Sequence, residues 1–118
     1  MMRAYHRKKK RNSPEMDIQK ALCSLLRAHG WYVKETHGNK YQTGFPDVYA
    51  THSTYGVRWI EVKLPDMKGS KFTPAQMIEF PKLRANGTRI WILTAATDRE
   101  YQKLFKPDNI NFWLLEKM

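Results

Sequence analysis

The sequence predicts an α/β protein with a mixed β-sheet flanked by helices, and three observations support this. Two segments, at residues 13–14 and 73–76, have the capping residues and prolines that begin helices. Five short segments rich in β-branched and aromatic residues are separated by turn residues, as strands are. Short turns join the first three strands, which favours antiparallel pairing, whereas a helix precedes the next strand, as a parallel crossover requires.

The first half of the chain is expected to form one helix and three strands. Ser13 and Pro14 begin the helix, apolar residues follow at helical spacing, and Gly30 ends it. Residues 31–36 are the first expected strand and residues 47–51 the second, with a polar loop between them. A turn at Gly56 leads into residues 57–63, the clearest strand of the sequence.

The second half is expected to alternate helices and strands. Thr73-Pro74-Ala75-Gln76 begins a helix with a capping box, and this helix should run to Ala85 with a kink at Pro81. Residues 89–95 are an expected apolar strand, residues 98–105 a short helix, and residues 110–115 a last strand at an edge of the sheet. The predicted order is therefore α-β-β-β-α-β-α-β.

Length and composition predict one folded domain. At the usual ~100–200 residues per domain, 118 residues make one, and 42% hydrophobic with 13% aromatic residues argues against general disorder. We expect a flexible basic arm at residues 1–12 and a single domain at residues 13–118. No stretch reaches the ~20 apolar residues of a membrane span. Cys23 is the one cysteine of the sequence, which excludes an intramolecular disulfide and a CxxC zinc site and favours a cytoplasmic location.

The charge of the chain predicts a polyanionic partner. Its 21 Lys and Arg against 11 Asp and Glu give a formal net charge of +10, and nucleic acid is the commonest partner of such a protein. Much of this charge lies in the arm, which contains no acidic residue. Its basic residues are Arg3, Arg7, Lys8, Lys9, Lys10 and Arg11. We expect these residues to contact phosphates without reading bases, and the alternative is a solvated tail.

Two short segments hold the candidate chemistry. Residues 44–47 (Gly-Phe-Pro-Asp) open the second strand, and residues 61–63 (Glu-Val-Lys) close the third. Side chains alternate along a strand, so Glu61 and Lys63 share a face, and a hairpin turn at Gly56 would bring Asp47 opposite them. For Glu-x-Lys alone, a solvated ion pair is the alternative.

Converging carboxylates indicate a site for a hard metal ion. Two such groups repel each other unless a cation lies between them, and oxygen ligands suit Mg²⁺ or Mn²⁺ better than zinc. A lysine beside the ion can position a water molecule and neutralise charge on a pentacovalent phosphate. The predicted chemistry is hydrolysis of a phosphodiester.

These motifs resemble a known family. Pro46-Asp47 with Glu61-Val62-Lys63 resembles the PD-(D/E)xK nuclease superfamily. The longer motifs Gly44-x-Pro46-Asp47, Ile60-Glu61-Val62-Lys63 and Thr73-Pro74-Ala75-Gln76 resemble its VRR-NUC branch, the virus-type replication-repair nucleases, with Holliday junction resolvases close to it. The resemblance implies a restriction-endonuclease-like core of order α-β-β-β-α-β. It also implies a Mg²⁺- or Mn²⁺-dependent DNA endonuclease, selective for junction or flap DNA, in a bacterial cell or phage-infected host.

The resemblance also implies residue roles. Asp47, Glu61 and the Val62 carbonyl would bind the metal, Lys63 would be the catalytic lysine, and Gln76 matches a glutamine of this branch, with a capping role as the alternative. The family has an acid on its first helix, which Glu15 matches. At about 100° per residue, Glu15 lies within roughly 20° of Leu22 on the apolar face, whereas Asp17 falls on the opposite side. The alternative for Glu15 is complementing the helix dipole.

Several further expectations concern the substrate and the assembly. Lys40, Tyr41, Lys68 and Lys71 are expected to contact the nucleic-acid backbone, with solvated loops as the alternative. A two-fold symmetric junction favours a homodimer through residues 89–95 and 110–115, and the alternative is a monomer with those strands in its own core. RNA remains open as a substrate. The other functions considered are a non-catalytic nucleic-acid-binding module with the nuclease fold and a restriction or homing-type endonuclease.

The basic arm gives a first prediction. Deleting residues 1–11 should flatten the dependence of log affinity on log salt by roughly 3–5 units for duplex DNA, because each phosphate neutralised contributes about 0.9. Binding isotherms over a range of salt concentrations measure this slope. The single-turnover cleavage rate at saturating enzyme should hardly change. An unchanged slope would show that the arm is only a solvated tail.

Overall fold

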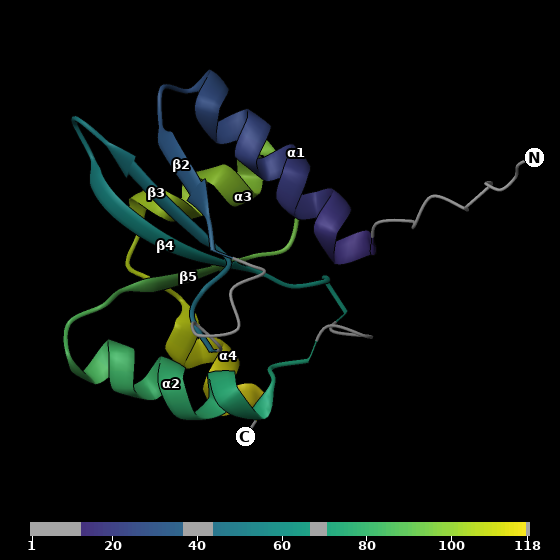
Figure 1. Cartoon of the computed structure of the whole chain (residues 1–118), viewed down its shortest axis with the longest axis vertical. Helices are drawn as coiled ribbons and strands as arrows, with labels where there is room; N and C mark the ends of the chain where they lie inside the picture. The colour runs from purple at the N-terminus through teal and green to yellow at the C-terminus, as the bar shows by residue number, and fades with distance from the viewer. Residues whose placement is uncertain (1–12, 37–43, 67–70, 118) are drawn as a thin grey trace, which may run out of the picture.

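A mixed four-stranded sheet forms the centre of the computed structural model, which describes residues 13–36, 44–66 and 71–117 (Figure 1). Its strands, in the order of the sheet, are β2 (Tyr32–Glu35), β3 (Val48–His52), β4 (Gly56–Val62) and β5 (Ile90–Leu93). The first three pair antiparallel and β5 pairs parallel to β4. This confirms the predicted mixed sheet.

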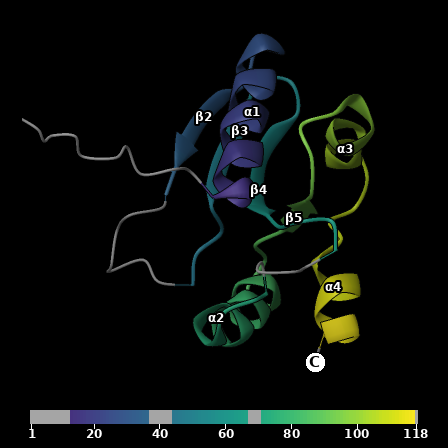
Figure 2. The ribbon, with the colours of Figure 1, turned by 90° about the vertical axis from the view of Figure 1, so that its right-hand side faces the viewer.

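Helices cover both faces of the sheet (Figure 2). One face carries α1 (Pro14–Ala28) and α3 (Asp98–Gln102), the latter continued by the 3₁₀ turn η2 (Lys103–Phe105), and the other carries α2 (Pro74–Ala85) and α4 (Ile110–Lys117). Within the described part of the chain, no helix is both long and apolar enough to span a bilayer.

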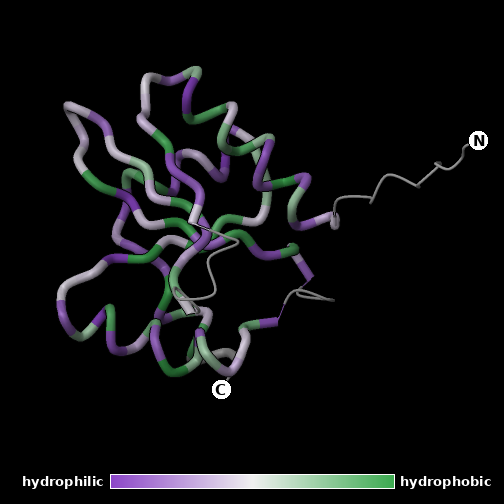
Figure 3. The backbone as a smooth tube through the Cα atoms, in the orientation of Figure 1, coloured by the Kyte–Doolittle hydropathy of each residue, from purple (hydrophilic) through white to green (hydrophobic). Residues whose placement is uncertain are grey.

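Two hydrophobic cores hold these layers together. The first lies under α1 and α3, and the second lies under α2 and α4. Strand β5 contributes side chains to both cores, because Trp91 and Leu93 face the first core while Ile90 and Ile92 face the second. Burial on both faces explains why this strand is apolar throughout. Figure 3 shows hydrophobic stretches of the backbone gathered in the middle of the fold.

Both predicted helix starts are present. The Ser13 hydroxyl accepts the Met16 N–H at 3.1 Å, which caps α1. Thr73 and Gln76 form the predicted capping box at the start of α2. Helix α2 continues through Pro81 and ends at Ala85, as the sequence indicated.

The prediction of a last edge strand at residues 110–115 is wrong, because this segment is helix α4. Side chains before the helix occupy the outer edge of β5, where a fifth strand would have paired. The Asn109 side chain accepts the Ile92 N–H at 2.6 Å and donates to the Ile92 carbonyl at 3.0 Å, and Asp108 accepts the Ile90 N–H at 2.8 Å. The following apolar residues then pack as a helix, which places Ile110 and Leu114 on one buried face.

This arrangement also revises the surfaces expected for a dimer. The apolar side chains of β5 are buried within this chain, and its outer edge is hydrogen-bonded at Ile90 and Ile92. Residues 110–115 form a helix rather than a strand, with Phe112 exposed, and a dimer contact through residues 89–95 and 110–115 stays a prediction. A homodimer itself stays a prediction.

Candidate functional site

The two predicted segments meet where β3 begins and β4 ends. The turn at Gly56 sets the register, which pairs Val48 with Ile60. Asp47 Oδ2 accepts the Val62 N–H at 3.0 Å, and the Asp47 N–H donates to Glu61 Oε1 at 3.2 Å. The carboxylates of Asp47 and Glu61 therefore converge as predicted, and each is fixed by a backbone N–H of the other strand.

Lys63 lies beside Glu61, on the same face of β4. Its Nζ is 3.1 Å from Glu61 Oε2 and donates to Gln76 Oε1 at 3.0 Å and to the Lys71 carbonyl at 3.1 Å. The Phe72 ring lies 4.8 Å from the ammonium group. Lys63 is only 2% exposed, so its three N–H bonds all point to acceptors within the protein.

Gln76 joins the start of α2 to this cluster. Its side-chain oxygen accepts both the Thr73 N–H and the Lys63 ammonium, each at 3.0 Å. Its amide nitrogen donates to Glu61 Oε2 at 2.8 Å. Gln76 therefore both caps α2 and belongs to the candidate site, because the same side chain makes both sets of hydrogen bonds.

Glu15 faces the same region from the first turn of α1. It is half-buried, and its negative charge contributes to raising the pKa of Asp47. Asp17, by contrast, is exposed. The helical geometry that favoured Glu15 over Asp17 thus agrees with the structure, while a metal-binding role for Glu15 stays a prediction.

The electrostatics of the site disfavour two free carboxylates. Burial is the largest cause that raises the pKa of Asp47 above its ordinary value, and the charge of Glu15 adds to it. Burial and the neighbouring Asp47 raise the pKa of Glu61 to about 8, although Lys63 opposes this. One ammonium group is not enough to hold this set of acids in the charged form.

The donor set suits a hard divalent cation. Asp47 and Glu61 converge beside Lys63, the cation that the described residues place in contact with Glu61, and the charge of Glu15 acts on Asp47 from α1. Continuing the strand register places Pro46 opposite Val62, and proline has no N–H to offer to the Val62 carbonyl. Among the described residues, no group of three or more His, Cys, Asp and Glu is arranged as a complete metal cluster. A bound ion would therefore rely mainly on Asp47 and Glu61, with further oxygen donors completing its coordination, as Mg²⁺ commonly does.

The other predicted contacts are only partly described. Arg7, Lys8, Lys9, Lys10, Arg11, Lys40, Tyr41 and Lys68 lie outside the described residues, as does the rest of the expected arm at residues 1–12. Lys71 is exposed, and its backbone carbonyl accepts from Lys63.

The sequence reasoning missed a polar pair beside the site. Gln19 is buried, and its amide donates to the Glu35 carboxylate at the end of β2 at 2.8 Å. Burial raises the pKa of the Cys23 thiol to about 11, and the charges of Glu35 and Asp47 add to this effect. The sequence feature that could have indicated this pair is the position of Gln19, which lies one helical turn after Glu15 on the apolar side of the helix.

Gly44 allows the chain before Asp47 to approach α2 closely. Its φ is +92°, and a Cβ there would lie 2.8 Å from Glu79 Cγ and 3.1 Å from the Ala75 carbonyl oxygen. A side chain at this position would push the segment leading to Pro46 and Asp47 away from the helix. Steric crowding against α2 thus explains why the predicted motif has a glycine at position 44.

Comparison with known proteins supports the fold. No family model and no curated protein matches the sequence. A solved structure described as a VRR_NUC domain superposes with a TM-score of 0.58 at 20% sequence identity, over 78% of this chain and 95% of that chain. The chain therefore has the fold of a VRR_NUC domain, a mixed sheet with flanking helices, as the sequence predicted.

The raised carboxyl pKa values predict how stability depends on pH. The folded protein holds protons on Asp47 and Glu61 that the unfolded chain releases at about pH 4. The free energy of unfolding of the metal-free protein should therefore fall as the pH rises from about 4 to about 8. Asp47→Asn should make this fall smaller, because it removes one of the two groups that bind protons more tightly in the folded state than in the unfolded chain.

Urea unfolding in the presence of a chelator, at both ends of this pH range, measures the effect. Asp98→Asn, at an exposed position in the first turn of α3, is the matched control and should keep the wild-type pH dependence. An Asp47→Asn protein with the full wild-type decline would contradict this electrostatic account.

Gly44→Ala should destabilise the protein more than Gly87→Ala does. Both glycines have positive φ, so both alanines incur a similar backbone strain of about 1–2 kcal/mol. Only position 44 has atoms within 4 Å of the added Cβ. The two melting temperatures measure the difference, and equal losses would show that the close approach to Glu79 and Ala75 relaxes freely.

Proposed function

We propose that this protein is a metal-dependent nuclease that hydrolyses phosphodiester bonds. The observation that supports this best is the direct contact among four predicted residues. Asp47, Glu61, Lys63 and Gln76 are joined by hydrogen bonds or an ion pair at the adjoining ends of β3, β4 and α2. A buried cluster of two acids, a lysine and an amide is a costly arrangement, and functional sites are where such arrangements concentrate.

Asp47 and Glu61 are the side chains that would hold Mg²⁺ or Mn²⁺, with the Val62 carbonyl and Glu15 as further oxygen donors. When bound, such an ion polarises the phosphoryl oxygen and lowers the pKa of a bound water molecule. The protein prepares the oxygen donors in advance. The Val62 N–H orients Asp47, and the Asp47 N–H with the Gln76 amide orients Glu61.

We propose that Lys63 neutralises charge on a reacting phosphate. Its ammonium group is held by Glu61, Gln76 and the Lys71 carbonyl, all at 3.0–3.1 Å. A phosphate oxygen that accepts from Lys63 must replace one of these three acceptors. We propose that Gln76 acts as a positioning residue, because it holds Lys63 with its oxygen and Glu61 with its nitrogen.

We propose DNA with junction or flap structure as the substrate and a homodimer as the active assembly. The net charge of +10 supports a polyanionic substrate. One chain offers one cluster of catalytic type among its described residues, and symmetric cutting of two strands is simplest with two copies. The dimer contact must avoid the outer edge of β5, since Asp108 and Asn109 cover it.

A cleavage panel tests this proposal. The panel contains a flap, a four-way junction, a linear duplex, single-stranded DNA and matched RNA, each with Mg²⁺, with Mn²⁺ and with a chelator. We expect metal-dependent cleavage that is strongest for branched DNA. Binding without cleavage of any substrate would instead favour a non-catalytic nucleic-acid-binding module.

Asp47→Asn, Glu61→Gln and Lys63→Ala should each reduce cleavage at least about 100-fold, the usual cost of removing one group that stabilises the transition state. The first two should also lose the rise in melting temperature that a bound divalent ion gives to the folded state. Lys63→Ala should keep that rise, because it removes no metal ligand.

Asp98→Asn and Lys34→Ala are matched controls at exposed positions on α3 and β2, and both should retain activity. Wild-type cleavage by folded Lys63→Ala would show that the site has been assigned wrongly. Single-turnover rates separate these chemical effects from effects on substrate binding.

A further inference from the structure

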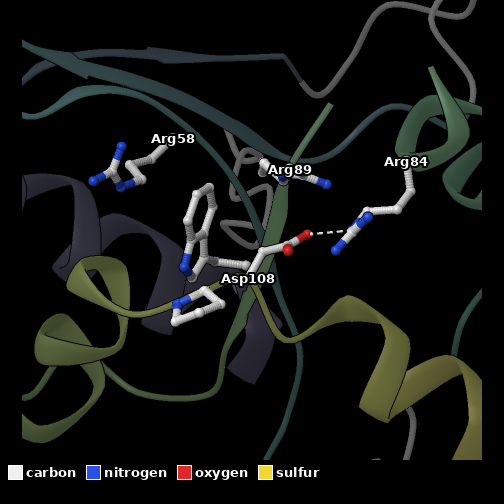
Figure 4. A pocket seen from close by; sticks show the side chains of 6 residues that line it. Arg58, Arg84, Arg89 and Asp108 are labelled. Carbon is white, nitrogen blue, oxygen red and sulfur yellow. Dashed lines mark hydrogen bonds and ion pairs between the residues drawn. The ribbon is translucent and has the colours of Figure 1, made fainter. Parts of the chain in front are cut away.

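A hollow of about 340 Å³ lies at the start of β5, away from the candidate catalytic residues. We propose that it binds a backbone phosphate of a nucleic-acid strand. Six residues line it, three of them arginines: Arg58, Arg84, Arg89, Trp91, Pro107 and Asp108 (Figure 4). The choice of a nucleic acid as the source of the phosphate rests on the proposed function, whereas the preference for an anion rests on the hollow itself.

The hollow has an excess of positive charge. Arg84 Nε lies 3.0 Å from Asp108 Oδ2, and this pair accounts for the single acid of the lining. Asp108 also accepts the Ile90 N–H at 2.8 Å, and its side chain is 1% exposed. The described residues give Arg58 and Arg89 no carboxylate partner. Two arginine charges thus remain for a ligand.

Arg58 is fixed in place by neutral groups. Its Nε donates to the Leu104 carbonyl at 2.7 Å, and its Nη1 donates to the carbonyls of Tyr55 and Val57 at 2.9 and 3.0 Å. Its Cζ lies 4.9 Å from the centre of the Trp91 ring. The cation is therefore held in position against an aromatic wall, which lowers the local dielectric and strengthens attraction for an anion.

Arg89 completes the lining of the hollow. In Figure 4, Arg89 lies between Arg58 and Arg84. Arg89 is exposed, so its guanidinium group is accessible to a ligand from solution. Arginine presents a planar set of donors that matches two phosphate oxygens at once.

A second hollow of about 260 Å³ continues this surface, and Trp91 and Pro107 line both hollows. It adds Lys103 and Lys106 to the lining. Lys103 pairs with Glu100 at 2.7 Å, and Lys106 has no acidic partner among the described residues. The positive charge therefore extends along the connection from α3 to α4, as a surface that follows an extended polyanion would.

The hollow is distinct from the candidate catalytic site, because none of the candidate catalytic residues lines it. It lies at the Ile90 end of β5, which pairs with Trp59, whereas the acids and Lys63 lie at the Leu93 end. Three residue steps along β5 lead from Ile90 to Leu93, or about 10 Å. This corresponds to about three base steps along a duplex, at ~3.4 Å each. A phosphate in the hollow is thus a second contact, beyond the site of cleavage.

The test compares Arg89→Gln with Arg99→Gln, which removes the same charge at an exposed position on α3 outside both linings. Binding of duplex and single-stranded oligonucleotides is measured in chelator across a range of salt concentrations. For duplex DNA, Arg89→Gln should reduce the slope of log affinity against log salt by about 0.9, and Arg89→Lys should restore it. Arg99→Gln should keep the wild-type slope. Equal slopes for wild type and Arg89→Gln would overturn the proposal.

The Trp91 indole N–H signal in NMR spectra identifies the source of the phosphate. It should shift on addition of an unphosphorylated oligonucleotide, whose phosphates are all in the backbone, and this shift should be lost in Arg89→Gln. A shift caused only by inorganic pyrophosphate or a mononucleotide would overturn the assignment to a nucleic-acid backbone. These binding measurements need no metal and no active site, so they test the hollow alone. The proposed nuclease function is tested separately, and absence of cleavage would contradict it.

Discussion

The carboxylate of Glu61 is the group on which the arrangement of the site depends. Glu61 is 1% exposed, and a buried carboxylate is tolerated only when donors surround it. Those donors come from three separate elements: the Asp47 N–H before β3, the Lys63 ammonium after β4, and the Gln76 amide at the start of α2. Satisfying one buried acid therefore fixes the relative positions of the segments that contain Asp47, Glu61, Lys63 and Gln76.

The same requirement explains local features that would otherwise look unrelated. Gln76 can reach Glu61 only if α2 begins close to the sheet, and its capping bond with Thr73 fixes that starting point. The chain leading to Asp47 must then pass α2 closely, which Gly44 permits by having no Cβ. The glycine, the capping box and the acid-lysine motif are thus parts of one structural solution rather than three independent signals.

Much of this was predictable because it depends on local patterns. These patterns are the helix caps, the turn at Gly56 and the alternation of side chains along β4, each of which involves residues close in sequence. They were enough to predict that Asp47 lies near Glu61 and Lys63. The error at residues 110–115 had a long-range cause. The Asn109 side chain forms with Ile92 the hydrogen bonds that a neighbouring strand would form, and no periodicity in a short apolar segment indicates this. The Gln19–Glu35 pair and the arginine hollow were missed for the same reason, since each joins residues of separate elements.

The pair of strands β4 and β5 separates two kinds of electrostatic environment. At the end of β4, acids outnumber the one lysine, and burial makes every hydrogen bond essential to the geometry. At the start of β5, three arginines outnumber the one acid of the hollow, Asp108, which is already paired with Arg84. The first environment suits a small divalent cation and the second suits a phosphate. Because both are attached to the same hydrogen-bonded strands, the sheet sets a fixed spacing between the place where a phosphodiester could be cleaved and the place where its strand could be held.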